Sequence, residues 1–148
     1  MTRPSYHLMR LVDSTDSDNA SVALVARYLL LAQERQLEAA QRFLDQMAVL
    51  TFPGNVQFHT LDEVATWASR RYRRIEELVE HWDVIVRSVD EATVYCGGAL
   101  DGEDRDDDSF EGIRFLDRFQ IQHGRIVRQD VWNDPAELGI TPMKINRG

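Results

Sequence analysis

The sequence predicts an α+β domain in which helices pack on one face of a curved antiparallel sheet. Two helical patterns begin near residue 20, a third follows residue 60, and strand-like runs dominate residues 75–134. Helices in one run followed by strands in another are typical of this class. A chain of 148 residues has the size of one domain and buries roughly two-thirds of its unfolded surface. We therefore expect one cone-shaped α+β domain over residues 19–140, with a flexible arm at 1–18 and a tail at 141–148.

Each of the three expected helices rests on its own signal. The first begins at Ala20, and apolar side chains at positions 25, 28, 29 and 32 place Tyr28 on its buried stripe. The second repeats that spacing over residues 37–46. The third begins at Thr60, which forms a capping-box pattern with Glu63, and ends near residue 73.

The strands are predicted from β-branched and aromatic runs separated by turn residues. They lie at residues 48–52, 75–90, 92–101, 111–122 and 125–134. Pro53-Gly54, Asp90-Glu91 and His123-Gly124 supply turns, and residues 101–109 form an acidic loop. Gly97-Gly98 indicates a bulge or a close approach between backbones.

Asp117 breaks the alternation of the run at residues 111–122. Ile113, Phe115, Phe119 and Ile121 share one parity, and Asp117 stands among them. A carboxylate therefore points toward the core or a pocket, where it must find a partner or change its protonation state.

Composition excludes several classes of function. A formal net charge of −8 argues against binding to nucleic acid or to an anionic membrane. The single cysteine, Cys96, has no partner for a disulfide or a Cys-x-x-Cys motif. No signal peptide or membrane-length apolar segment is evident, so we expect a cytoplasmic protein. The basic run at residues 70–74 is interpreted as a helix end, with a phosphate site as the alternative.

The order of elements resembles the nuclear transport factor 2-like (NTF2-like) superfamily, in its SnoaL-like and ketosteroid-isomerase-like branch. The resemblance covers roughly residues 20–138. It rests on Ala26-Arg27-Tyr28, Gln36-Leu37-Glu38, Phe52-Pro53-Gly54, and the segments at residues 115–119 and 123–127. The superfamily hosts isomerases, cyclases, hydrolases, dehydratases and proteins without chemistry, so the resemblance implies a fold more than an activity.

The resemblance implies two polar groups in the pocket but no matching base. Tyr28 falls where steroid isomerases carry an oxyanion-hole tyrosine, and Asp117 falls at their protonated aspartic acid. The isomerase base position is occupied by Phe52, and the cyclase aspartate position by Val131. A slip of one residue would instead turn Asp130 inward and make it the base.

Further candidates complete the expected site. His59 lies at a plausible cavity mouth and is the second candidate base. Aromatic side chains and the inward parity of the last strand supply the expected ligand-binding residues: Phe52, Trp67, Tyr72, Gln129, Val131 and Asn133. No metal site is expected from His59, His81 or His123, and no cofactor is expected. Trp132, on the opposite parity, suggests a homodimer through the sheet face.

These observations favour a small-molecule-binding protein with an apolar ligand that bears a carbonyl or a phenol. If it is an enzyme, the expected reaction is isomerisation, aldol-type cyclisation or dehydration through an enolate, as in an isomerase or a polyketide cyclase-like lyase. The alternative is a ligand-binding or dimeric assembly module without chemistry, which the missing base favours.

Overall fold

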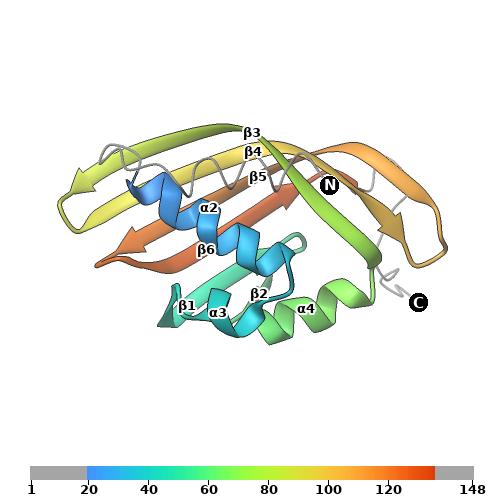
Figure 1. Cartoon of the computed structure of the whole chain (residues 1–148), viewed down its shortest axis with the longest axis horizontal. Helices are drawn as coiled ribbons and strands as arrows, with labels where there is room; N and C mark the ends of the chain where they lie inside the picture. The colour runs from blue at the N-terminus through green and yellow to red at the C-terminus, as the bar shows by residue number, and fades with distance from the viewer. Residues whose placement is uncertain (1–19, 136–148) are drawn as a thin grey trace.

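The computed structural model describes residues 20–135 and has an α+β architecture, with helices on one side of a curved sheet (Figure 1). The helices are α2 (Ala20–Gln33), α3 (Leu37–Gln41) and α4 (Leu61–Ser69). The strands are β1 (Leu44–Phe52), β2 (Val56–Phe58), β3 (Tyr72–Ser88), β4 (Glu91–Asp104), β5 (Ser109–Gln122) and β6 (Arg125–Asn133). The expected arm at 1–18 and tail at 141–148 lie outside the described residues.

The six strands form one open sheet in the order β2-β1-β6-β5-β4-β3. All neighbouring pairs are antiparallel except β1 and β6, which run parallel, so the expectation of a wholly antiparallel sheet is wrong at this one pair. The parallel pair joins the strand nearest the start of the chain to the strand nearest its end. The edge strands β2 and β3 do not pair with each other, so the sheet is curved rather than a closed barrel.

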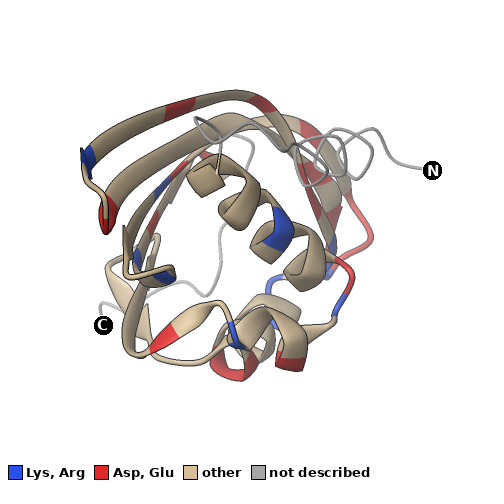
Figure 2. Ribbon diagram, turned by 60° about the vertical axis from the view of Figure 1, so that its left-hand side comes forward, with Lys and Arg blue, Asp and Glu red and all other residues tan. Residues whose placement is uncertain are grey.

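The helices close the concave side of the sheet. Figure 2 shows α2 lying inside the curve of the sheet, with the shorter helices at its open side. The capping box at Thr60 is confirmed: its hydroxyl accepts from the Glu63 backbone N–H at 3.3 Å, and Glu63 accepts from the Thr60 N–H at 3.0 Å. None of the helices within residues 20–135 is long and apolar enough to cross a bilayer.

The expected set of three full helices is only partly right. The second ends at Gln41 rather than near residue 46, because Leu44 begins β1 and pairs with Ile126 of β6. Met47, which continues the apolar spacing of that helical pattern, is 81% exposed. The short strand β2 was not predicted. Tertiary pairing with a strand about 80 residues away has overridden a local helical pattern here.

Strands β4 and β5 pair with each other along most of their length. The alternation predicted for β5 is confirmed, with Ile113, Phe115, Phe119 and Ile121 buried. The close approach predicted at Gly98 is also confirmed: a Cβ there would overlap the Leu78 carbonyl oxygen of β3. This contact lies where β3 carries a bulge, between Val79 and His81.

Candidate functional site

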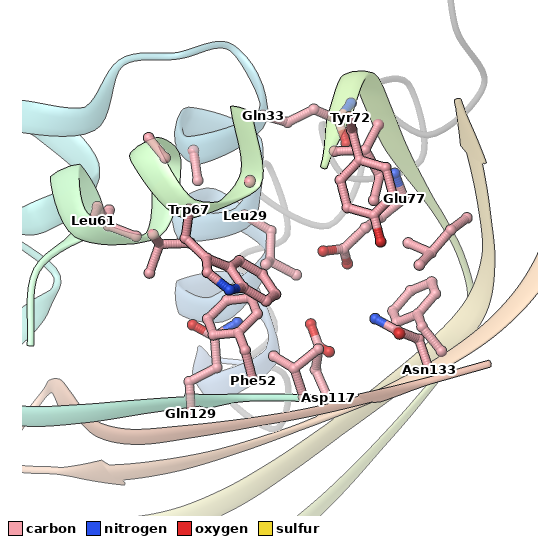
Figure 3. Close-up of a pocket in the computed structure, with 18 of the residues that line it drawn as sticks. Leu29, Gln33, Phe52, Leu61, Trp67, Tyr72, Glu77, Asp117, Gln129 and Asn133 are labelled. Atoms are coloured by element: carbon pink, nitrogen blue, oxygen red, sulfur yellow. The ribbon is translucent and has the colours of Figure 1, made fainter. Parts of the chain in front are cut away.

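A cavity of about 200 Å³ lies between helices α2 and α4 and the concave face of the sheet (Figure 3). Its wall is mostly aliphatic and aromatic, with a few polar groups converging on it, as in small-molecule sites generally. All six residues predicted from the sequence as ligand-binding lie on this wall: Phe52, Trp67, Tyr72, Gln129, Val131 and Asn133. The inward parity assigned to the last strand is therefore right.

Aromatic rings form one end of the cavity. The ring centroids of Phe52 and Trp67 are 5.3 Å apart, and Phe58 packs 5.6 Å from Trp67. Trp67 is carried by α4, so the capping box at the start of that helix also fixes the position of this wall. The rings are tilted by 60° and 57° to one another, and they give this end of the cavity an apolar wall.

Asp117 is buried and points into the cavity from β5, as the sequence predicted. Both of its carboxyl oxygens are removed from solvent and lack a well-formed hydrogen bond to any described residue. Burial raises the pKa of Asp117 well above its usual range, and the nearby Glu77 carboxylate raises it further. The Gln129 amide offsets only part of that rise. This shift favours the protonated form of Asp117, which can donate a hydrogen bond.

Glu77 is a second carboxyl group in the same cavity, and the sequence analysis did not single it out. It comes from β3, and Figure 3 shows its carboxyl group directed toward the space that Asp117 faces. Its Oε2 is out of solvent and has no hydrogen-bond partner among the described residues. Burial raises the pKa of Glu77 to about 7. Glu77 is therefore poised to take up or release a proton near neutrality.

Tyr28 is hydrogen-bonded to a residue of the last strand. Its hydroxyl donates to Gln129 Oε1 at 2.8 Å rather than to Asp117, and its ring meets Phe119 edge to face at 6.0 Å. Burial raises the pKa of Tyr28, and the Asp117 and Glu77 carboxylates add to that effect, so the phenol stays protonated. This bond fixes the Gln129 carbonyl on Tyr28 and leaves the Gln129 amide hydrogens for the cavity.

The two carboxyl groups differ enough to take different roles. Asp117 is fully enclosed and its pKa is raised well above the usual range, whereas the pKa of Glu77 is about 7. Because the groups act on each other, their protons come off as a coupled pair. An acid and a base that share one mostly apolar cavity are the arrangement that proton-transfer chemistry requires.

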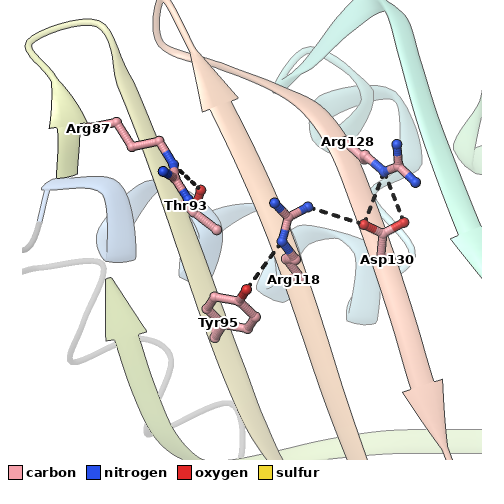
Figure 4. A network of polar contacts seen from close by, with 6 residues as sticks. All are labelled: Arg87, Thr93, Tyr95, Arg118, Arg128 and Asp130. Carbon is pink, nitrogen blue, oxygen red and sulfur yellow. Dashed lines mark hydrogen bonds and ion pairs between the residues drawn. The ribbon is translucent and has the colours of Figure 1, made fainter. Parts of the chain in front are cut away.

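Asp130 does not reach the cavity, which corrects its expected role as a base. It lies on the opposite face of the sheet, where it pairs with Arg128 at 3.0 Å and Arg118 at 3.4 Å (Figure 4). Arg118 Nε also donates to the Tyr95 hydroxyl at 3.3 Å. Since Gln129 and Val131 face inward, the side chain between them must face outward.

His59 is also outside the cavity, so its expected role as a base is corrected as well. The residue is exposed, and its Nδ1 lies 3.2 Å from the Ala48 carbonyl oxygen. Phe52 and Val131 occupy the cavity wall at the positions where the family resemblance places a base, and neither can accept a proton. Among residues 20–135, no three potential ligand side chains gather as a metal site requires.

The signal for Glu77 was present in the sequence but hard to read. Ile75, Glu77 and Val79 share a parity, as Asp117 shares one with its apolar neighbours. Two bulges in β3, next to Tyr72 and next to Val79, interrupt the alternation on either side. A further cavity residue, Arg71, belongs to the basic run that the sequence analysis interpreted as a helix end.

No protein-family model matches the chain, and neither does the sequence of any curated protein. Solved structures do match its fold. LinA superposes with a TM-score of 0.65 at 14% identity, over 88% of this chain and 90% of LinA. An NTF2-like protein of unknown function from Burkholderia pseudomallei K96243 gives 0.63 at 16% identity, over 79% of this chain and 92% of that one. A candidate SnoaL-like polyketide cyclase from Jannaschia sp. CCS1 gives a TM-score of 0.60 at 14% identity, over 80% of this chain and 88% of that one. The chain therefore has the NTF2-like fold that the sequence resemblance implied.

Proposed function

We propose that this NTF2-like fold houses an enzyme that transfers a proton next to a carbonyl group of a small apolar ligand, through an enolate. The observation that carries the proposal is the pair of cavity carboxyl groups: a neutral Asp117 and a Glu77 whose pKa is about 7. Isomerisation, aldol-type cyclisation and dehydration all pass through such a step. The match to a candidate polyketide cyclase supports the proposal at the level of fold alone.

The step assigns a separate role to each side chain. The Glu77 carboxylate takes the proton from the carbon beside the carbonyl, and the C–H electron pair becomes the new C=C bond. The carbonyl π electrons move to its oxygen, and the resulting enolate accepts a hydrogen bond from protonated Asp117. The Gln129 amide, held by Tyr28, is the second donor to that oxygen. Glu77 then returns its proton to another carbon, so no cofactor is needed for the transfer.

A nitrobenzisoxazole is a suitable first probe, because removal of its ring C–H proton breaks the N–O bond and releases a coloured cyanonitrophenolate. We expect the rate to rise with pH around a midpoint of about 7. Glu77→Gln keeps the shape of the side chain and should lower the rate at pH 8 by roughly 10²-fold or more. Asp117→Leu should lower it because the developing phenolate loses its donor.

Glu76→Gln is the matched control. Glu76 is the neighbour of Glu77 on β3, but it pairs with Arg74 at 3.3 Å and does not line the cavity. Its variant should keep the rate of the native protein. Equal rates for native protein and Glu77→Gln across the pH range would rule out the proposed base.

The second candidate function is ligand binding without turnover. It is favoured by Phe52 and Val131, which stand at the positions where related enzymes are expected to hold a base. It predicts that aromatic phenols bind in the cavity, while nitrobenzisoxazole reacts no faster with the protein than in buffer alone.

We also propose that the chain forms a homodimer through the convex face of the sheet. Leu116 and Trp132 are direct neighbours across β5 and β6, and they are 38% and 51% exposed. The charged side chains of Arg118, Asp130 and Arg128 (Figure 4) lie on the same face of β5 and β6, because they share the parity of Leu116 and Trp132. An apolar centre flanked by polar groups is the usual composition of a protein interface.

A further inference from the structure

Arg71 differs from the other arginines of its run. It lies in the turn between α4 and β3, is half-buried, and lines the cavity. Its guanidinium carbon stands 4.1 Å from the centroid of the Trp67 ring. Its Nε is out of solvent and has no hydrogen-bond partner among the described residues.

Arg73 and Arg74 of the same run are neutralised by acidic side chains. Arg73 pairs with Asp107 at 2.8 Å, and Arg74 pairs with Glu76 at 3.3 Å and Glu103 at 3.4 Å. For Arg71 the corresponding neighbour is the Tyr72 hydroxyl, which carries no charge at neutral pH. Burial lowers the pKa of Arg71, although an arginine remains protonated at any ordinary pH. The guanidinium is therefore a cation inside the cavity wall without a matching anion from residues 20–135.

The acids of the site do not neutralise it either. The pKa of Asp117 is raised by the charge of Glu77, and the pKa of Glu77 is raised by burial alone, so Arg71 contributes to neither. Arg71 thus lies apart from the carboxyl pair, at the end of the cavity where Trp67 stands. The cavity thus has an acidic part around Asp117 and Glu77, and a basic group at its aromatic end.

The guanidinium lies over the Trp67 ring, and at least one of its N–H groups is left for an anion. Tyr72 takes one side-chain hydrogen bond from Arg71, whereas the Nε–H has no partner among the described residues. A carboxylate matches the edge of a guanidinium with two oxygens in one plane. Arg35 also lines the cavity but is exposed, so Arg71 is the guanidinium that is half-buried in the wall. One half-buried guanidinium balances one negative charge, which favours a carboxylate over a phosphate dianion.

We infer that the ligand of this cavity carries a carboxylate that binds Arg71, with a one- or two-ring apolar body along Trp67 and Phe52. The inference deepens the proposed function, on which it rests for the reacting carbonyl at the Asp117 and Glu77 end. The size of the cavity agrees with a compact ligand, since about 200 Å³ is below the roughly 300–1,000 Å³ of typical drug-sized sites. Arg71 serves to orient the ligand, and the chemistry stays with the carboxyl pair.

Two probes of the same shape test the inference: a hydroxynaphthoate and the corresponding hydroxynaphthamide, which lacks the charge. Calorimetric titration of the native protein should show that the carboxylate binds at least tenfold more tightly than the amide. Arg71→Gln should remove that preference while changing the affinity for the amide only slightly. Arg73→Gln removes an exposed arginine of the same run and should keep the preference.

Several results would overturn the inference. The first is equal affinity of the native protein for the two probes, and the second is no measurable binding of the carboxylate. The third is a loss of the carboxylate preference in Arg73→Gln as large as that in Arg71→Gln. Tighter binding of a naphthyl phosphate than of the carboxylate would overturn the choice of anion. The outcome is separable from that of the proposed function. A carboxylate preference without nitrobenzisoxazole turnover would refute the proposed enzyme activity and support the anion site at Arg71. Turnover without the carboxylate preference would support the enzyme activity and refute the anion site.

Discussion

Glu77 should make the protein less stable as it ionises, and replacing it should relieve that cost. Its pKa is 4.5 in an unfolded chain and about 7 in the folded protein. The folded state therefore binds the proton more tightly, so the contribution of Glu77 to stability is full below pH 4.5 and is lost as pH rises toward 7. The difference corresponds to about 3 kcal/mol of unfolding free energy at most.

The assay is urea unfolding of native protein and Glu77→Gln at pH 5 and at pH 8. The variant should gain stability relative to the native protein between the two pH values, by up to about 3 kcal/mol, because its amide does not ionise. Loss of the Glu77 charge also eases the burial of Asp117, so the coupling acts in the same direction as the contribution of Glu77 itself.

Glu76→Gln again provides the control, because it removes the same charge from an exposed pair with Arg74. Such a pair contributes about 1 kcal/mol or less. The difference in unfolding free energy between native protein and Glu77→Gln is the quantity to compare. If it stays constant from pH 5 to pH 8, or changes in the opposite direction, Glu77 is not desolvated in the cavity.

Two further predictions concern Tyr28 and Trp132. Tyr28→Phe leaves the Gln129 carbonyl oxygen buried without its donor, so urea unfolding should show a loss of about 1–3 kcal/mol; unchanged stability would mean that water or another group replaces the hydroxyl. Trp132→Lys places a charge at the centre of the proposed interface, so sedimentation should show a dimer for the native protein and a monomer for the variant; a native monomer would exclude this interface.

The parts of the fold that followed local rules were predictable from the sequence. Thr60 and Glu63 are three residues apart and cap α4 as the pattern indicates. His123 and Gly124 both have positive φ, at 50° and 75°, as expected of a tight hairpin turn. The buried position of Asp117 followed from its parity alone.

The parts that depend on distant contacts were not predictable in the same way. The early end of α3 depends on the pairing of Leu44 with Ile126, which no local pattern encodes. The partner of Tyr28 depends on how far Gln129 reaches across the cavity from β6. Glu77 was missed because bulges in β3 break the alternation that made Asp117 visible in β5.

The parallel pairing of β1 with β6 has a consequence for how the protein folds. Strands β2 and β1 attach to the rest of the sheet only through β6, the last strand of the chain. During synthesis, β3, β4 and β5 can form a meander first, while β1 waits for a partner that emerges about 80 residues later. Contacts of such sequence separation slow folding, since a long loop must close before they form. The cavity depends on Gln129, Val131 and Asn133 of β6 and is therefore completed last. A nascent chain that stops at residue 122 would contain both Glu77 and Asp117 and still lack the β6 side of the cavity that encloses them.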